Sequence, residues 1–175
     1  ARYAADGSLD TSFGQGGTIV GDLGSAEGVV VQPDGKIIAA GNGLGSATLV
    51  TFDFVLERYN ADGSRDGTFG SDGRVATDLS ADQDFGENLA LQPDGKIVVV
   101  GQKTTSTVYD LAIVRYATDG SVDTSFGTSG SLTTDFFGSG DLAKDVAIQA
   151  DGKIVVAGFA ANGLVTESVL LRVEP

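Results

Sequence analysis

The sequence predicts an all-β protein built from three copies of one four-stranded antiparallel unit. The first observation is a ten-residue motif that occurs three times, at residues 32–41, 92–101 and 149–158, as QPDGKIIAAG, QPDGKIVVVG and QADGKIVVAG. The second is the regular spacing around it, because Phe13, Phe69 and Phe126 lie 56 and 57 residues apart. The third is that no segment shows helical periodicity over more than two turns. A repeat of this length is typical of stacked supersecondary units.

Each ten-residue motif predicts a strand, a tight turn and a second strand. Pro93 presets φ for the second position of a type I turn, Asp94 tolerates the third, and Gly95 accepts the left-handed conformation that closes a bulged hairpin. We therefore expect positive φ at Gly35, Gly95 and Gly152. The apolar run after the turn has no polar alternation, which predicts a strand covered on both faces.

Four strands are predicted in each unit. The first follows a Phe-Gly turn (17–22, 74–78, 131–135), the second precedes the hairpin turn (28–32, 88–92, 145–149), the third follows it (36–41, 96–101, 153–158), and the fourth ends the unit (about 49–59, 108–116, 165–173). The prediction is one repeat domain over residues 1–175, with repeats at about 2–57, 58–114 and 115–171 and the stub of a fourth at 172–175.

Units of this size with apolar middle strands favour β-propeller-type blades that pack face to face around an axis. The segment 58–70, RYNADGSRDGTFG, would then cross from the outer strand of one blade to the inner strand of the next. The alternative is a β-trefoil, which also has three four-stranded units, although its units are usually shorter.

One resemblance concerns these same residues. RYNADGSRDGTFG, followed by QPDGKIVVVG and an apolar strand that ends in a new Arg-Tyr pair, resembles the delta-60 repeat family. The resemblance covers essentially the whole chain, with small departures such as Ala150 in place of the turn proline. It implies β-propeller blades in tandem, no established catalytic residue, and an extracellular or cell-surface location.

Composition excludes several kinds of function. The chain has 11 Lys and Arg against 24 Asp and Glu, a net charge of −13, which argues against nucleic acid or an anionic membrane as a partner. No segment approaches 18 apolar residues, so no membrane insertion is expected. Cys and His are both absent, which excludes thiolate and imidazole chemistry and the usual zinc ligands.

The recurring aspartates are the candidates for a metal site. Hard cations need several carboxylate and carbonyl oxygens from one short segment, so the calcium candidates are Asp6, Asp10, Asp62, Asp66, Asp119 and Asp123. The structural interpretation is that each Asp-Gly pair makes a tight turn and each second Asp caps backbone N–H groups. The spacing does not match an EF-hand, and we favour the structural interpretation. No cofactor is expected, with calcium as the alternative.

The recurring basic and aromatic residues are expected to be structural as well. Each Arg is expected to pair with a recurring acid, either from the set Asp53, Asp110 and Glu167 or from the set Asp10, Asp66 and Asp123. The basic residues concerned are Arg2, Arg58, Arg115, Arg172, Lys36, Lys96 and Lys153. The rings of the repeated Phe, and of Tyr3, Tyr59 and Tyr116, could stack on a sugar, but packing between blades is favoured.

Catalysis is not expected. Repeated acids lie in equivalent environments, whereas an acid–base pair needs two different ones. The polar residues that break the repeat form no recognisable constellation: Gln102, Lys103, Thr104, Asp82, Asp84 and Lys144. The sequence therefore predicts a non-catalytic extracellular module for structure, assembly or binding, with a carbohydrate-directed propeller hydrolase or lyase as the alternative. Three blades cannot close a ring, so self-association or another protein is expected to cover the two end faces, with carbohydrate as another candidate ligand.

Overall fold

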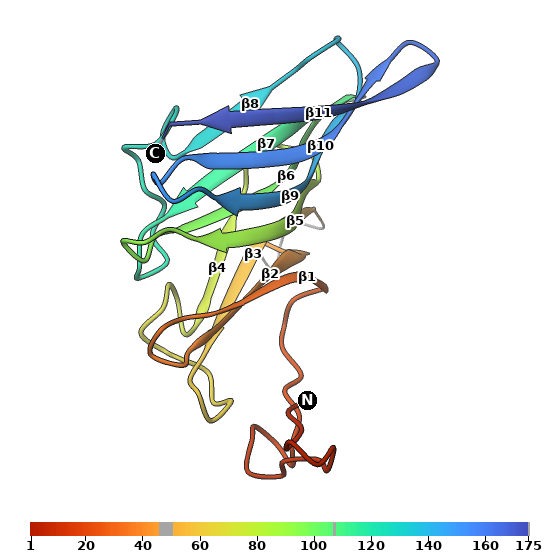
Figure 1. The fold of residues 1–175 in the computed structure, drawn as a ribbon. Helices are drawn as coiled ribbons and strands as arrows, with labels where there is room; N and C mark the ends of the chain where they lie inside the picture. Colours follow the sequence, from red (N-terminus) through yellow and green to blue (C-terminus); the bar gives the residue numbers. More distant parts are fainter. Residues whose placement is uncertain (46–50, 107, 175) are drawn as a thin grey trace.

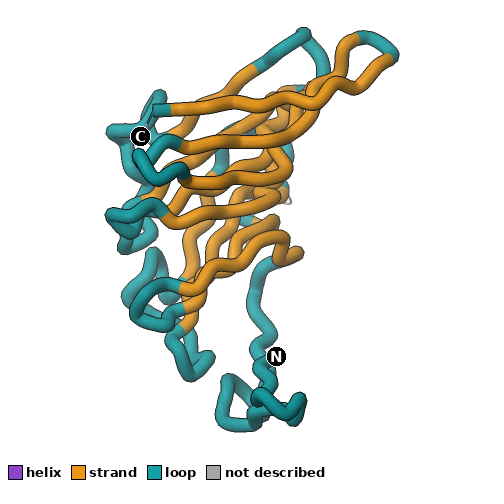
Figure 2. Tube along the Cα trace, in the orientation of Figure 1, coloured by secondary structure: helices purple, strands orange, loops and turns teal. Residues whose placement is uncertain are grey.

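The computed structural model describes residues 1–45, 51–106 and 108–174, and it contains three antiparallel sheets (Figures 1 and 2). We call them blades. Blade 1 contains β1 (Ser25–Val31), β2 (Ile37–Leu44), β3 (Phe52–Tyr59) and β4 (Arg74–Thr77). Blade 2 contains β5 (Asp84–Leu91), β6 (Ile97–Thr105), β7 (Val108–Tyr116) and β8 (Ser131–Thr134). Blade 3 contains β9 (Asp141–Ile148), β10 (Ile154–Asn162) and β11 (Val165–Val173).

The blades pack face to face, with blade 2 between the other two, which confirms the all-β, propeller-type prediction over the trefoil (Figure 1). Residues 1–24 precede β1 and lie beyond blade 1, at the end opposite blade 3 (Figure 1). The described residues include no helix, and hence none that could cross a membrane.

The hairpin that opens each blade forms as predicted. Gly35, Gly95 and Gly152 all have φ of +84°. In each turn the glycine N–H donates to the carbonyl of the Gln three residues earlier, at 2.9 Å, and that Gln N–H donates to the carbonyl of the Lys that follows. This is a type I turn closed by a left-handed glycine, as local turn chemistry requires.

Coverage of the middle strand depends on the position of the blade. In β6 of blade 2 the five residues from Ile97 to Gly101 are all buried, as a strand covered on both faces should be. In β2 and β10 buried residues alternate with partly exposed ones at the start of the strand. The end blades are therefore covered on one face only.

The prediction of which strands share a sheet was wrong. The strand after the Phe-Gly turn pairs with the strand before it, so that β4 adds to β3 and β8 adds to β7 as the last strand of the same blade. The loop 58–73 folds back through two tight turns, with Arg58 N–H donating to Gly73 O, instead of crossing to the next blade. The predicted strand at 17–22 is not formed; that segment has one isolated bridge, between Gln15 and Thr18. The start of the predicted strand 49–59 lies partly outside the described residues.

Two apolar cores fill the junctions between blades. The first joins Ile38, Ala40, Phe54 and Leu56 of blade 1 to Leu89, Ile97, Val99 and Tyr116 of blade 2. The second joins Val98, Val100, Leu111 and Ile113 of blade 2 to Val146, Ile154 and Val156 of blade 3. Alternate residues of one strand thus face opposite junctions, so a blade contributes a different set of side chains to each neighbour.

Candidate functional site

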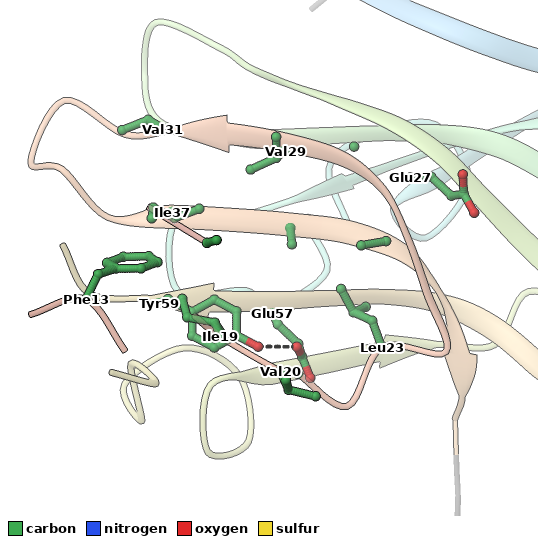
Figure 3. A pocket seen from close by; sticks show the side chains of 15 residues that line it. Phe13, Ile19, Val20, Leu23, Glu27, Val29, Val31, Ile37, Glu57 and Tyr59 are labelled. Atoms are coloured by element: carbon green, nitrogen blue, oxygen red, sulfur yellow. Dashed lines mark hydrogen bonds between the residues drawn. The ribbon is translucent and has the colours of Figure 1, made fainter. Parts of the chain in front are cut away.

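A groove of about 670 Å³ lies on the open face of blade 1, bordered by the N-terminal segment (Figure 3). Its walls are mainly apolar and come from residues 13–23 and from β1, β2 and β3: Phe13, Ile19, Val20, Leu23, Val29, Val31, Ile37, Ala39, Glu57 and Tyr59. Val29 and Val31 are about two-thirds exposed and Val20 is 95% exposed. We call this surface the leading face.

The leading face is the repeat equivalent of a surface that is buried elsewhere in the chain. Val29 and Ile37 occupy the same positions in blade 1 as Leu89 and Ile97 occupy in blade 2, as the strand pairing of each sheet shows. Both blade 2 residues belong to the core that blade 1 covers. Phe13 and Tyr59 correspond in the same way to Phe69 and Tyr116. The groove therefore lies on the face of blade 1 that corresponds to the blade 2 surface covered by blade 1, and no other blade of the described residues covers it.

One buried carboxylate lies in this groove, and it breaks the repeat. Glu57 is fully buried, whereas the equivalent residues, Val114 and Leu171, are apolar. Its oxygens accept a hydrogen bond from the Tyr59 hydroxyl (Figure 3). They also accept from the Asp22 N–H at 2.9 Å and from the Arg65 guanidinium at 3.0 Å. Burial and the bond to Glu57 raise the pKa of Tyr59 to about 12. Glu57 thus holds the N-terminal segment against β3.

Each repeat contains one Arg–Asp–Phe stack, which we call a clasp. Arg58 donates through Nε to Asp66 at 2.8 Å, and its guanidinium lies 4.5 Å from the centre of the Phe69 ring. Its Nη1 donates to Thr118 O of the next repeat at 2.6 Å. The Lys36 ammonium completes the clasp at 2.9 Å from Asp66. The equivalent Arg, Asp and Phe are stacked in the other repeats: Arg2, Asp10 and Phe13, and Arg115, Asp123 and Phe126.

The clasp decides between the two sets of acids proposed for the arginines. Asp10, Asp66 and Asp123 are the partners, whereas Asp53 and Asp110 lie elsewhere. Hydrogen bonds from Thr68, and then the Lys36 and Arg58 charges, hold the pKa of Asp66 well below its usual range. The other calcium candidates, Asp6, Asp62 and Asp119, each accept from the N–H and the hydroxyl of the Ser two residues later, as a turn cap does.

The recurring Phe is buried in all three repeats, whereas the recurring Tyr is exposed in the first. Phe13, Phe69 and Phe126 are at most 5% exposed, and the last two belong to the junction cores. Tyr59 and Tyr116 are also buried, but Tyr3 is 64% exposed, so its predicted packing role is wrong. The reason is positional: Tyr59 and Tyr116 end strands of a blade, and Tyr3 stands in no strand.

Two groups of acids come together that the sequence reasoning missed. Asp53, Asp78 and Asp84 present carboxylate oxygens within 4.8 Å of one another, and so do Asp110, Asp135 and Asp141. The signal was present, since each member of the second group lies 57 residues after its counterpart in the first. Asp84 had been grouped with polar residues that break the repeat. Among the described residues, these two groups of carboxylates lie close enough together to hold a metal ion.

Comparison with known proteins agrees with the fold. A family model described as "Domain of unknown function (DUF5122) beta-propeller" matches residues 1–13, 32–69, 92–126 and 149–175. These segments contain the three hairpin motifs and the three clasps, and the narrower delta-60 name stays a prediction. No curated protein matches the chain. Because the model covers more than half of the sequence and the structure consists of stacked four-stranded antiparallel blades and a three-stranded one, the chain belongs to this β-propeller family of unknown function.

Proposed function

We propose that this protein is a non-catalytic scaffold module that associates head to tail with further copies of itself. The observation that supports this most directly is the pair of unlike apolar surfaces at its two ends. One is the leading face of blade 1. The other, which we call the trailing face, is the outer surface of blade 3, with Ala147, Val155, Ala157 and Leu170. Leu170 is 77% exposed.

The two end faces match each other as the internal junction surfaces do. Val155 and Leu170 occupy the same positions in blade 3 as Val98 and Ile113 occupy in blade 2. Both blade 2 residues are fully buried against blade 3. The leading face corresponds to the surface that blade 1 covers on blade 2. A trailing face laid on a leading face would therefore repeat a contact that the chain already makes twice. Exposed apolar surfaces of this kind mark interaction sites.

The open edge of blade 3 supports the same arrangement. In blades 1 and 2 the third strand pairs with a short fourth strand, for instance Leu56 with Val75 and Ile113 with Leu132. Among the described residues β11 has no such partner. The segment 18–21 is the repeat equivalent of β4 and β8, and it lies beside the leading face. In the proposed contact, 18–21 of one copy pairs with 168–171 of the next, which removes an unpaired strand edge.

Repetition of this contact can give either a closed ring or an open filament. Two copies would contribute six blades, within the range of closed propellers, and a rotation that does not close would give a filament. The acids of the leading face favour a non-catalytic role, because Glu57 is engaged by Tyr59, Asp22 and Arg65, and Glu27 accepts from the Ser25 hydroxyl. An extracellular or cell-surface location remains part of the proposal through the delta-60 resemblance.

The test is the molar mass in solution as a function of concentration, measured by analytical ultracentrifugation, with electron microscopy for filaments. Leu170→Glu and Val29→Glu each place a charge on one end face and should leave a monomer. Leu164→Glu is the matched control, because Leu164 is fully exposed on the β10–β11 turn, outside both faces. Wild-type protein that stays monomeric at high concentration, or association that survives both face variants, would overturn the proposal.

A further inference from the structure

The two aspartate groups described above lie where one blade is joined to the next. Asp53 lies on β3 and Asp78 directly follows β4, so both belong to blade 1, whereas Asp84 is the first residue of β5 in blade 2. Asp110, Asp135 and Asp141 occupy the same places between blades 2 and 3. We call the contact between blades 1 and 2 junction 1 and the contact between blades 2 and 3 junction 2, and each aspartate group belongs to one of them. Asp78, Asp84, Asp135 and Asp141 all lie between the segments that the family model matches.

Each junction has a buried carboxylate oxygen that the described part of the protein leaves unbonded. Asp53 is 2% exposed and Asp141 is fully buried, and Oδ1 of each accepts no hydrogen bond from the described residues. Buried polar atoms nearly always have a partner, because desolvation without one is costly. The unbonded oxygen belongs to the β3 acid in the first group and to the β9 acid in the second, so these are different members of the two groups. Each group nevertheless contains one such oxygen, which indicates a ligand there.

Hydrogen bonds from the backbone hold two of the buried acids, Asp84 and Asp141, in place. Asp84 accepts from the N–H groups of Leu79, Ser80 and Thr104 at 2.8, 3.0 and 3.1 Å, and from the Ser80 hydroxyl at 2.9 Å. Asp141 accepts from the Phe136 N–H at 2.7 Å through Oδ2. These bonds tie the loop between two blades to the first strand of the second blade, so the carboxylates are oriented before any ligand arrives.

The described basic residues neutralise only part of the charge of these groups and form no ion pair with them. The basic side chain whose charge acts on Asp53 is Arg74, and the one that acts on Asp110 is Lys103. Among the described residues neither is within 4.0 Å of any of the six carboxylates. Arg74 instead donates to Leu44 O at 2.6 Å. The acids recur at 57-residue spacing but the basic residues do not, since Ser131 stands where Arg74 would recur. Three carboxylates and one cation leave a net charge of −2 at each junction.

The acids respond to this crowding. Burial raises the pKa of Asp53, and the charges of Asp78 and Asp84 raise it further. Burial also raises the pKa of Asp141, with Asp135 and Asp110 adding to it. Repulsion between carboxylates in a buried setting is relieved either by a proton or by a bound cation.

We propose that each junction binds one Ca²⁺ ion, and that the two ions fasten neighbouring blades to each other. Carboxylate oxygens drawn from separate strands suit a hard cation, and the doubly negative surplus matches a divalent one. Calcium is the better fit than magnesium, because Mg²⁺ demands a near-ideal octahedron and keeps several waters, whereas Ca²⁺ accepts irregular sets of protein oxygens. The site differs from every calcium candidate that the sequence singled out, since those acids are occupied by the clasps and turn caps.

The experiment is calorimetric titration of chelator-treated protein with Ca²⁺, together with thermal unfolding in Ca²⁺, Mg²⁺ or chelator. We expect two Ca²⁺ per chain and a melting temperature raised by about 10–20 °C at a hundredfold excess over Kd, half of it from each ion. Asp78→Asn and Asp135→Asn should each remove one ion, and the double variant should remove both together with the calcium-dependent rise. Asp78 is exposed, so its substitution should not prevent folding.

The control is Asp72→Asn, which removes one exposed negative charge at a position outside both junctions and should retain both ions. Failure of wild-type protein to bind Ca²⁺ would overturn the proposal, as would a double variant that still binds two ions. Stabilisation by Mg²⁺ equal to that by Ca²⁺ would overturn the choice of cation. A melting temperature that rises with acidification but not with Ca²⁺ would show that protons relieve the repulsion between the carboxylates. That result would also overturn the proposal.

Discussion

Substitution of Gly101 by Ala tests the backbone geometry on which each blade depends. Gly101 lies on β6 opposite Gly86, at the point where the β5–β6 register shifts between Gly86 and Asn88. A Cβ on Gly101 would lie 1.9 Å from the Phe85 carbonyl oxygen. The equivalent glycines, Gly41 and Gly158, would meet a backbone oxygen at 2.0 and 1.9 Å. The bulge brings the backbones too close for any side chain.

The expected cost follows from how far the strands must separate. Contacts of a Cβ below 3.0 Å essentially never occur, so β5 must move by about 1 Å relative to β6. Overpacking of a dense core costs about 1–3 kcal/mol, and each buried backbone hydrogen bond lost adds about 1–3 kcal/mol. We expect Gly101→Ala to lower the free energy of unfolding by about 3 kcal/mol or more. For a domain of this size that lowers the melting temperature by about 6–12 °C.

Two other glycines separate this clash from backbone strain. Gly16 has φ of +62° with nothing within 4 Å of its Cβ position, so Gly16→Ala measures strain alone, about 1–2 kcal/mol. Gly95→Ala adds to the same strain a contact at 3.1 Å with the Thr118 Cγ2 methyl, which can move aside. The expected order of destabilisation is Gly101→Ala, then Gly95→Ala, then Gly16→Ala.

The assay is urea unfolding followed by far-ultraviolet circular dichroism, with one m-value shared by the variants. A Gly101→Ala protein as stable as the Gly16→Ala protein would refute the reasoning, since the bulge would then accommodate a side chain. Loss of Ca²⁺ binding at junction 1 in the same variant would be consistent with it, because Asp84 begins the strand that has to move.

Three further outcomes follow from the clasps and cores. Phe69→Ala should lower the free energy of unfolding by about 3–5 kcal/mol. Phe13→Ala should lower it by about 1–2 kcal/mol less in the monomer, because the Phe13 ring borders an open groove. Equal losses in urea unfolding would contradict the assignment of Phe69 to a closed junction. Asp66→Asn should cost about 3 kcal/mol at pH 7. The folded state lowers the pKa of Asp66, so this contribution is present above the unfolded pKa of about 4 and is lost as pH falls below it. Plots of the free energy of unfolding against pH should therefore converge in acid for variant and wild type. Parallel plots would contradict the ion pair. Tyr116→Phe should cost about 1 kcal/mol through the lost bond to Thr77 Oγ1, and burial raises the pKa of Tyr116, so an absorbance titration should show it ionising only on unfolding.

The parts of this structure that depend on neighbouring residues in the chain could be predicted from the sequence. The hairpin turns belong to this class, because Pro93, Asp94 and Gly95 limit the backbone angles whatever surrounds them. The turn caps at Asp62 and Asp119 belong to the same class, since each carboxylate accepts a hydrogen bond from a Ser two residues later. The number of blades followed from the repeat spacing, and their apolar middle strands followed from the absence of polar alternation.

Features that depend on distant pairing were decided only by the tertiary structure. The short strand β4 carries no signal that says whether β3 or β5 is its neighbour, and only the fold of the 58–73 loop places it beside β3. Glu57 stands in the sequence where the other repeats have Val114 and Leu171, but its role appears only once Tyr59, Asp22 and Arg65 surround it. Asp53, Asp78 and Asp84 recur with visible regularity, yet a regular spacing does not say which repeated acids meet. That depends on where two blades touch, because carboxylates interact through space, and the distance between them is set by packing and not by their separation along the chain.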